Sequence, residues 1–337
     1  MRSARRRRSA AVFFLSGMMC LSAVFCVDAA AVQARKLVPV GHTIGIKLFS
    51  DGVVVIGLAE VETPQGVRAP GVACGLQIGD VIEEANGTEV ESTEQFSALL
   101  QCGGMVDLSV SRGGEELTLT ALPVKGEDGQ YRLGAWIRDS MAGIGTVTFY
   151  DPETGRFGAL GHGVTDGDTG QLMPLGDGAV MRSTVKAVKK GSSGAPGQLR
   201  GEFDLKRDMG VLYANTEQGV FGALEACEMT QGEALPVAAP SEVHEGKAMI
   251  YCNVSGDSVE AYEIEILRVL GAEGSQNMLL HVTDKELIAK TGGIVQGMSG
   301  SPIIQDGKLV GAVTHVLVND PTRGYGIFIE NMLEAAE

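Results

Sequence analysis

A serine flanked by small residues is the sharpest chemical signal in this sequence. Ser299 lies in the segment Gly-Met-Ser-Gly-Ser-Pro at 297–302. A serine nucleophile needs an exposed hydroxyl on a tight turn, and the backbone N–H groups of Gly297 and Ser299 could then stabilise an oxyanion. This pattern predicts acyl transfer at Ser299, with a serine in a structural glycine turn as the alternative. A second glycine-flanked serine, Ser193, is followed by no apolar strand and is expected in a loop.

A serine nucleophile needs a general base, and histidine fills that role most often. The sequence offers five histidines: His42, His162, His244, His281 and His315. His162 fits best because it follows the expected strand 157–160 and stands between two glycines, which leave its ring accessible. His315 falls on an expected strand and could instead be packed in a core.

The acid that would orient the histidine does not follow from spacing alone. The candidates are Asp166, Asp168, Asp204, Asp208 and Asp284. The first two lie uncomfortably near His162 in the sequence, and the next two match the histidine–aspartate interval of chymotrypsin. The last ends the expected strand 278–282, shortly before Ser299. The residues themselves leave these alternatives open.

Short strands joined by tight turns are expected to carry these residues. The chain has 47 glycines, about twice the usual share, and only 5% aromatic residues. The expected strands are 146–150, 157–160, 264–270, 278–282 and a hairpin over 303–313. The hairpin has an Asp-Gly turn, which is a strong hairpin signal. We therefore expect a mainly β domain over residues 131–337.

Residues 37–125 read as a smaller domain ahead of it. Strands are expected at 44–49 and 53–58, joined by a Ser-Asp-Gly turn. Ser92 and Gln95 have the spacing of a helix capping box, and an apolar helical face follows them.

The string GLQIGDVIEEANGTEV at 75–90 resembles that of protease-associated PDZ domains. The resemblance implies that a peptide ligand, or a segment of this chain itself, adds as an extra strand beside the helix that begins near Ser92. The strand expected to receive it contains Ile44, Gly45 and Ile46.

The N-terminus predicts export. Arg2 and the arginines at 5–8 precede an uncharged, apolar run at 9–27, and small residues follow at 29–31. Basic residues before an apolar run keep the N-terminus in the cytoplasm and send the rest across the membrane. Residues 1–36 are therefore expected to be a signal peptide or a retained membrane anchor with a linker, and both alternatives stay open.

The net charge argues against nucleic acid as a partner, and the cysteine spacing argues against a metal site. A net charge of -15 disfavours nucleic acid, because an acidic surface repels phosphate. The cysteines beyond the N-terminal run are Cys74, Cys102, Cys227 and Cys252. They could form two disulfides or remain thiols, and no pair has the spacing of a metal site.

Two long strings resemble the SpoIVB peptidase family, the stage IV sporulation proteins of endospore-forming bacteria. They are GIGTVTFYDPETGRFGALGH at 143–162 and TGGIVQGMSGSPIIQDGKLVGAVTHVLVNDPTRGYGIFIENML at 291–333. The order of targeting segment, PDZ domain and chymotrypsin-like β-barrel peptidase is also similar. The resemblance implies a catalytic triad of His162, Asp284 and Ser299. A mechanism of this kind needs no metal and no organic cofactor.

The resemblance also implies a place and a role. Such enzymes are exported into the space between the two membranes around the forespore. There they cleave themselves and then a protein of a membrane-embedded regulatory complex, which triggers intramembrane proteolysis and activates a late sigma factor. Two alternatives are a catalytically silent PDZ scaffold and a general exported quality-control protease, although the latter usually carries its PDZ domain after the protease.

Overall fold

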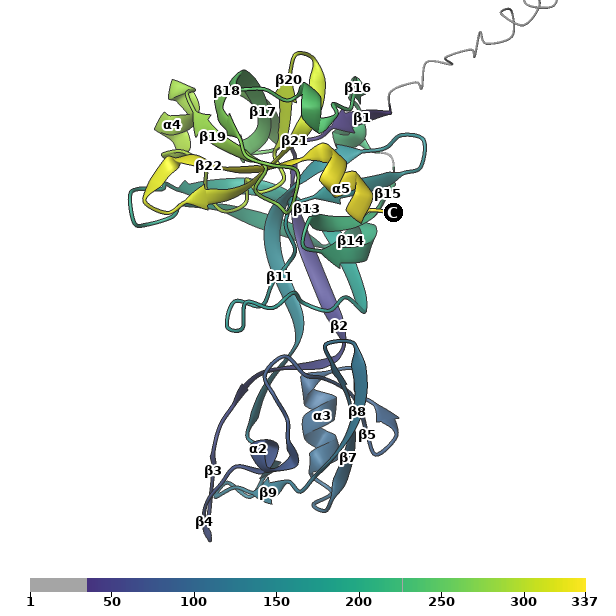
Figure 1. Ribbon diagram of the computed structural model, residues 1–337. Coiled ribbons are helices and arrows are strands. Elements are labelled where there is room, and N and C mark those ends of the chain that lie inside the picture. Colours follow the sequence, from purple (N-terminus) through teal and green to yellow (C-terminus); the bar gives the residue numbers. More distant parts are fainter. Residues whose placement is uncertain (1–34, 226) are drawn as a thin grey trace, which may run out of the picture. The chain divides into compact units, whose positions relative to one another are not determined.

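The computed structural model describes residues 35–225 and 227–337 (Figure 1). The predicted targeting segment lies almost wholly within residues 1–34, outside the described residues. Among the residues that are described, no helix is long and apolar enough to cross a membrane.

Six antiparallel strands pair in a ring to form the first barrel. They are β2 (Thr43–Leu58), β11 (Ala135–Tyr150), β12 (Arg156–Ala159), β13 (Asp177–Lys189), β14 (Gln198–Thr216) and β15 (Gly219–Leu224). The ring closes because β2 pairs along both edges, so that Ile46 faces Gly143 of β11 and Val180 of β13. Its interior is apolar, with Ile44, Ile46 and Val180 among the buried side chains.

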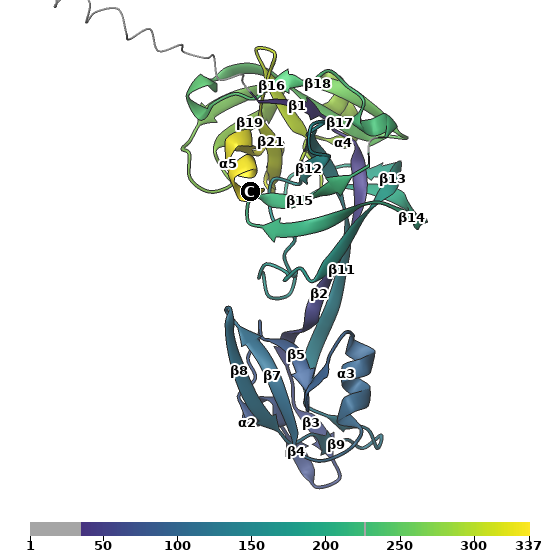
Figure 2. The same cartoon turned by 90° about the vertical axis from the view of Figure 1, so that its right-hand side faces the viewer.

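Six further strands form the second closed barrel (Figure 2). They are β17 (Gly246–Ser255), β18 (Ser258–Val269), β19 (Met278–Val282), β20 (Pro302–Gln305), β21 (Lys308–Leu317) and β22 (Asp320–Phe328). Alternate residues of β19 are buried, as expected for a strand with one face on a core. Helix α4 (Lys285–Thr291) follows β19, and α5 (Ile329–Ala335) follows β22.

The two barrels repeat one topology. In each, the spatial order is first, second, third, sixth, fifth and fourth strand, after which the fourth pairs with the first. The short strands β1 (Lys36–Pro39) and β16 (Leu235–Pro236) extend the sheet beyond β11. Two 3₁₀ turns, η1 (Glu228–Thr230) and η2 (Pro240–Glu242), precede the second barrel. The mainly β architecture expected from the sequence is confirmed.

A smaller module, residues 53–134, is inserted between the first and second strands of the first barrel. Its elements after β2 are β3 (Val61–Thr63), β4 (Gly66–Arg68), α2 (Pro70–Cys74), β5 (Val81–Ala85), β6 (Thr88–Glu89), α3 (Thr93–Leu100), β7 (Val106–Arg112), β8 (Glu115–Ala121), β9 (Val124–Lys125) and β10 (Tyr131–Arg132). It has its own core, in which Val53, Ile82 and Phe96 are buried. The end of β2 joins this module by pairing with β5.

The observed boundaries differ from the expected ones. The sequence suggested a domain at 37–125 followed by a second one at 131–337, whereas the first barrel already begins with β2 at Thr43. The turn expected at 50–52 lies within the continuous strand β2, where the pairing with β11 shifts register. Gly52 permits this irregularity with φ +103, and a side chain there would collide with the Ile82 carbonyl.

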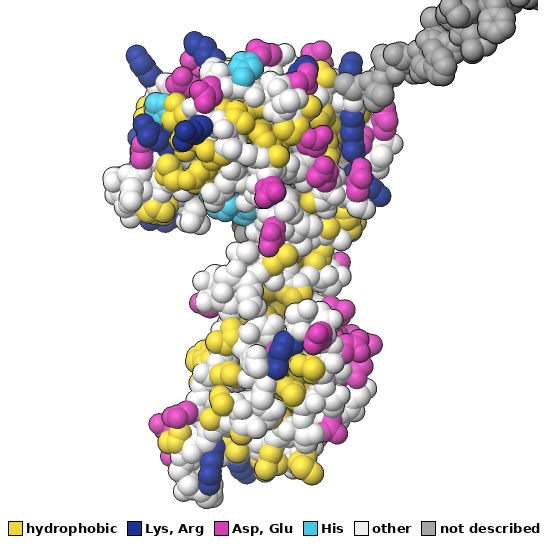
Figure 3. All heavy atoms as spheres, in the orientation of Figure 1, with side chains coloured by type: hydrophobic (Ala, Val, Ile, Leu, Met, Phe, Trp, Pro, Cys, Tyr) yellow, Lys and Arg dark blue, Asp and Glu magenta, His cyan; other side chains and the backbone are white. Residues whose placement is uncertain are grey.

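The surface carries many acidic side chains, as the net charge of -15 predicts. Asp and Glu side chains are scattered over the face seen in Figure 3.

All four described cysteines are free thiols, so the structure shows the second of the two alternatives left open by the sequence. Burial raises the pKa of the Cys252 thiol, which makes it unreactive.

Candidate active site

Ser299 lies on a tight loop between α4 and β20. Two glycines in the left-handed region shape this loop, Gly297 with φ +100 and Gly300 with φ +96. A side chain at Gly300 would lie 2.0 Å from the Thr146 carbonyl oxygen, so only glycine fits. The Ser299 hydroxyl donates a hydrogen bond to the carbonyl oxygen of Thr314 at 2.7 Å.

His162 follows β12 on a strained turn. Leu160 and Gly161 both have φ +69, and a side chain at Gly161 would press on Ile327 of the second barrel at 2.9 Å. The Nδ1 of His162 lies 2.8 Å from the Gly163 carbonyl oxygen. Since a carbonyl only accepts, Nδ1 carries the proton and Nε2 is left as the basic atom. Burial lowers the pKa of His162, which favours the neutral imidazole that a general base requires.

The structure brings Ser299 and His162 together on one cleft of about 380 Å³. The first barrel supplies Leu160 and His162 to its lining, and the second barrel's side supplies Ser299, Thr314 and His315. A serine hydroxyl and a neutral imidazole on one cleft are the two groups that nucleophilic acyl transfer needs.

Two backbone N–H groups beside the serine are available to a ligand. Among the described residues, the N–H groups of Gly297 and Ser299 find no hydrogen-bond acceptor. The carbonyl of Gln296 is held by the N–H of Leu199 at 2.8 Å. Because the C=O and N–H of a trans peptide point in opposite directions, this contact turns the Gly297 N–H away from β14. The predicted oxyanion-hole donors are therefore unpaired in the structure.

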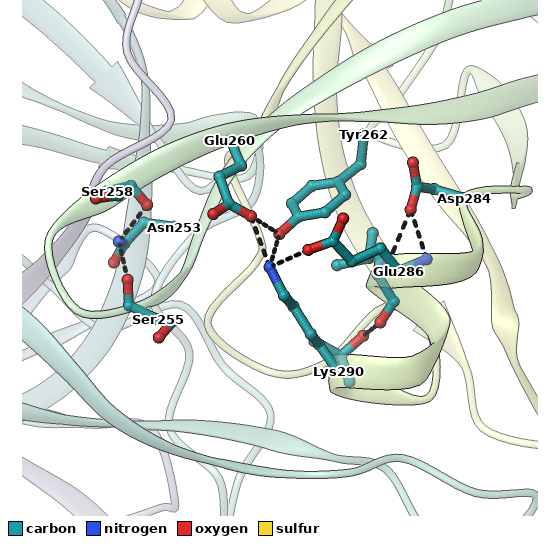
Figure 4. Close-up of polar contacts among 10 residues, drawn as sticks. Asn253, Ser255, Ser258, Glu260, Tyr262, Asp284, Glu286 and Lys290 are labelled. Carbon is teal, nitrogen blue, oxygen red and sulfur yellow. Dashed lines mark hydrogen bonds and ion pairs between the residues drawn. The ribbon is translucent and has the colours of Figure 1, made fainter.

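Asp284 does not line the cleft, and its carboxylate caps a helix. Its carboxylate caps α4 by accepting hydrogen bonds from the N–H groups of Glu286 at 2.8 Å and Leu287 at 3.0 Å (Figure 4). An aspartate at a helix N-terminus is a common cap because it satisfies free N–H groups there. The structure does not bring Asp284 to His162, whose Nδ1 partner is a backbone carbonyl instead.

The other aspartates considered from the sequence do not fill this place either. Asp166 pairs with Arg138 and accepts the N–H of Thr169. Asp204 and Asp208 are exposed on β14. The described residues that line the cleft include no carboxylate.

His315 is a cleft residue that the sequence did not single out. Its ring lies 4.9 Å from that of His162, centroid to centroid, with a tilt of 37°. Burial lowers the pKa of His315, and the neighbouring His162 lowers it further. The sequence placed His315 on a strand correctly, but its direction depends on barrel closure, which a local pattern does not reveal.

An ion-pair network fixes the helix that leads into the serine loop. Lys290, in the last turn of α4, contacts Glu260 at 2.7 Å, Glu286 at 2.8 Å and the Tyr262 hydroxyl at 3.0 Å (Figure 4). The i, i+4 spacing of Glu286 and Lys290 was the one local signal for it. The network ties α4 to β18 of the second barrel.

The peptide-binding strand predicted from the sequence is corrected by the structure. Ile44, Gly45 and Ile46 lie on β2 between β11 and β13, and both strand edges are already paired. Ile44 and Ile46 are buried in the first barrel's core. A peptide cannot add to a strand that has no free edge.

A groove of about 750 Å³ lies instead between α3 and the start of β11. Its apolar lining includes Phe96, Leu100 and Trp136, the last 67% exposed. Within Ala135–Ile137, β11 pairs along one edge with β2, and no strand of the described residues pairs with its other edge. The sequence assigned this segment to the following domain, which hid its place beside the helix.

Residues 129–333 match the family model for the SpoIVB peptidase S55. The chain belongs to the SpoIVB peptidase family. The protein is accordingly a serine peptidase, and the match spans the Ser299 and His162 loops. The strand β2, which completes the first barrel, lies outside the matched range.

Two solved structures similar to this chain are of serine proteases. The active form of the Rv3671c protease from M. tuberculosis is 16% identical, with 59% of this chain and 75% of that one covered and a TM-score of 0.31. The thermostable serine protease AL20 from an extremophilic microorganism is 14% identical, with 59% and 91% covered and a TM-score of 0.33. No curated protein matches the sequence. The assignment rests on the family match.

Proposed function

We propose that this protein is an exported serine endopeptidase with Ser299 as nucleophile and His162 as general base. The observation that carries the proposal is the shared cleft, which is lined by Ser299, by His162 and by Gly297, and at which the N–H groups of Gly297 and Ser299 have no acceptor among the described residues. Backbone N–H groups are normally hydrogen-bonded, and a catalytically silent scaffold gives no reason for two unpaired ones beside a serine.

The chemistry proceeds by acyl transfer. The Ser299 oxygen attacks a peptide carbonyl while its proton passes to Nε2 of His162, and the Nδ1–H bond to Gly163 holds the ring in the required tautomer. The substrate oxygen gains negative charge and is stabilised by the N–H groups of Gly297 and Ser299. Collapse expels the amine with the proton from His162, and water then hydrolyses the acyl-enzyme by the same route.

The nucleophile must change partner before it reacts. A serine hydroxyl has a single proton, and in the structure this proton is donated to the Thr314 carbonyl. Attack therefore requires the hydroxyl to turn toward His162. We infer that substrate binding drives this rotation.

Labelling by a fluorophosphonate probe tests the assignment on the full chain. The unchanged chain should be labelled and Ser299→Ala should not. Ser301→Ala is the matched control, because Ser301 is fully buried two residues later and its hydroxyl has no partner among the described residues. Equal labelling of the unchanged chain and Ser299→Ala would refute the assignment.

The pH dependence of labelling gives a second readout of the same reaction. Because burial holds the pKa of His162 below its usual 6.5, the neutral base should already predominate at pH 6.5. The labelling rate should rise with pH and reach half its maximum below pH 6.5. A midpoint above that value would contradict a buried His162 as the base.

The biological role is proposed on the family membership and on the N-terminal pattern of arginines before an apolar run. We propose that the enzyme acts in the space around the forespore, cleaves itself, and then cleaves a membrane-associated regulatory protein that triggers intramembrane proteolysis and late sigma-factor activation.

The inserted module is proposed to be a PDZ-type peptide-binding domain whose groove lies between α3 and β11. The open edge of Ala135–Ile137 supports addition of a peptide strand, and Phe96 and Leu100 would contact its side chains. A segment of this chain or of the protein substrate would be the ligand.

A further inference from the structure

We propose that Thr146 is a positioning residue that locks the oxyanion hole and the histidine loop together across the two barrels. The proposal rests on the proposed function, because it assigns a role in the same acyl transfer. Thr146 lies on β11 of the first barrel and is fully buried.

All three polar groups of Thr146 bond to the loops that carry the reaction. Its hydroxyl donates to the Gly297 carbonyl at 2.7 Å, and its N–H donates to the Ser299 carbonyl at 3.0 Å. Its own carbonyl accepts the N–H of Leu160 at 3.2 Å. Thr146 of the first barrel thus contacts the serine loop on both sides of Met298. It also contacts the turn that precedes His162.

The contacts to the serine loop restrain one oxyanion donor, the N–H of Ser299. The Gly297 and Ser299 carbonyls belong to the peptide units that flank the one carrying the Ser299 N–H. With both flanking carbonyls held by Thr146, that N–H has little freedom to turn out of the cleft. The Thr146 hydroxyl therefore acts on the oxyanion hole through the backbone, without touching the substrate.

The hydrogen bond from Leu160 connects Thr146 to the turn that carries the general base His162. Leu160 holds φ +69, a conformation that residues with a side chain rarely adopt. Its N–H bond to Thr146 helps to maintain this turn, two residues before His162. A side chain at Gly300 would lie within 2.5 Å of the Leu160 nitrogen, which shows how closely the three segments meet.

The next inward threonine of the same strand supplies a matched control. Thr148 is also fully buried, but its hydroxyl has no hydrogen-bond partner among the described residues. Replacing Thr148 by valine removes a hydroxyl from the same strand without releasing either loop. The same change at Thr146 leaves the buried Gly297 carbonyl unpaired and free to turn.

The test measures fluorophosphonate labelling rates of the full chain for Thr146→Val, Thr146→Ser and Thr148→Val. Labelling builds negative charge in the oxyanion hole, so it reports on the alignment of the donors. Thr146→Val should slow it roughly 10- to 100-fold, somewhat less than deletion of a donor. Thr146→Ser and Thr148→Val should stay within about threefold of the unchanged chain, since neither frees the Gly297 carbonyl.

The pH midpoint of labelling should stay constant across these variants, because burial and the hydrogen bond to Gly163 are what shift the pKa of His162, and neither Thr146 nor Thr148 supplies them. Equal rates for Thr146→Val and the unchanged chain would overturn the proposal, and so would an equal slowing by Thr148→Val. If Thr146→Val does not fold, Thr146→Ser and Thr146→Ala differ only by the hydroxyl, and equal rates for that pair would overturn it. If the probe does not label the unchanged chain, both the proposed function and this proposal are refuted.

Discussion

At the scale of single residues, backbone carbonyls fill places that side chains occupy in a standard triad. Gly163 accepts the Nδ1–H of His162, and Thr314 holds the Ser299 hydroxyl. A neutral carbonyl fixes the tautomer of the imidazole as an aspartate would. It stabilises the imidazolium less, because it carries no charge.

Asp284 is predicted to matter for stability rather than for chemistry. Asp284→Ala should lower the free energy of unfolding by about 1 kcal/mol, the typical value of a helix cap. Asp284→Ser keeps a capping oxygen and removes the charge, so its stability and its labelling rate should stay close to those of the unchanged chain. Thermal unfolding and fluorophosphonate labelling measure the two effects.

A loss of labelling of about 10⁴-fold in Asp284→Ser, the size seen when a triad aspartate is neutralised, would contradict this reading. Asp177→Ser offers a control on an exposed aspartate of the first barrel.

Residue chemistry explains which site members the sequence could predict. Ser299, Gly297 and His162 stand out because nucleophile, donor and base require particular residue types with small neighbours. Asp284 was ambiguous because aspartate suits a helix cap as well as a triad. Thr146 gave no signal, since its hydroxyl partner lies 151 residues away in the sequence.

At the scale of elements, β2 and β11 do most to organise the molecule. Each is 16 residues long, and each takes part in the first barrel and in the inserted module. The sequence correctly predicted a mainly β fold and strands at 44–49, 53–58 and 146–150, but it predicted no strand over 135–145, the first part of β11. It divided β2 at residues 50–52, because a Ser-Asp-Gly string favours a turn as strongly as it favours a bulge.

Removal of β2 is predicted to prevent folding of the catalytic part. A fragment of residues 131–337 lacks the strand that buries Ile44, Ile46 and Leu48, and it exposes the facing edges of β11 and β13. It should show no cooperative thermal transition by circular dichroism, whereas a fragment of residues 36–337 should unfold cooperatively. Equal cooperativity in the two fragments would show that the barrel does not need β2.

At the scale of the whole molecule, the inserted module carries the groove that we propose as a second place for a peptide. Its groove has an acidic rim that includes Glu60, Glu62 and Glu127, while Arg132 is already paired with Asp128. Because the chain as a whole carries a net charge of -15, long-range attraction and local contacts both favour a basic peptide.

Trp136 makes this binding measurable. It is the one tryptophan of the chain, and it lies exposed in the groove. An extended peptide of alternating valine and lysine should shift its fluorescence to shorter wavelengths as the ring loses water. A peptide with glutamate in place of lysine should bind several-fold more weakly. An unchanged Trp136 spectrum with both peptides would place peptide binding elsewhere.

Ser299 is proposed to cleave peptide bonds, and self-cleavage of the purified chain measures this activity. The purified full chain is incubated beside Ser299→Ala and Ser301→Ala, and the products are followed by gel and intact mass. The unchanged chain and Ser301→Ala should give the same fragments, whereas Ser299→Ala should stay intact. Fragments that form equally fast in Ser299→Ala would contradict the proposal.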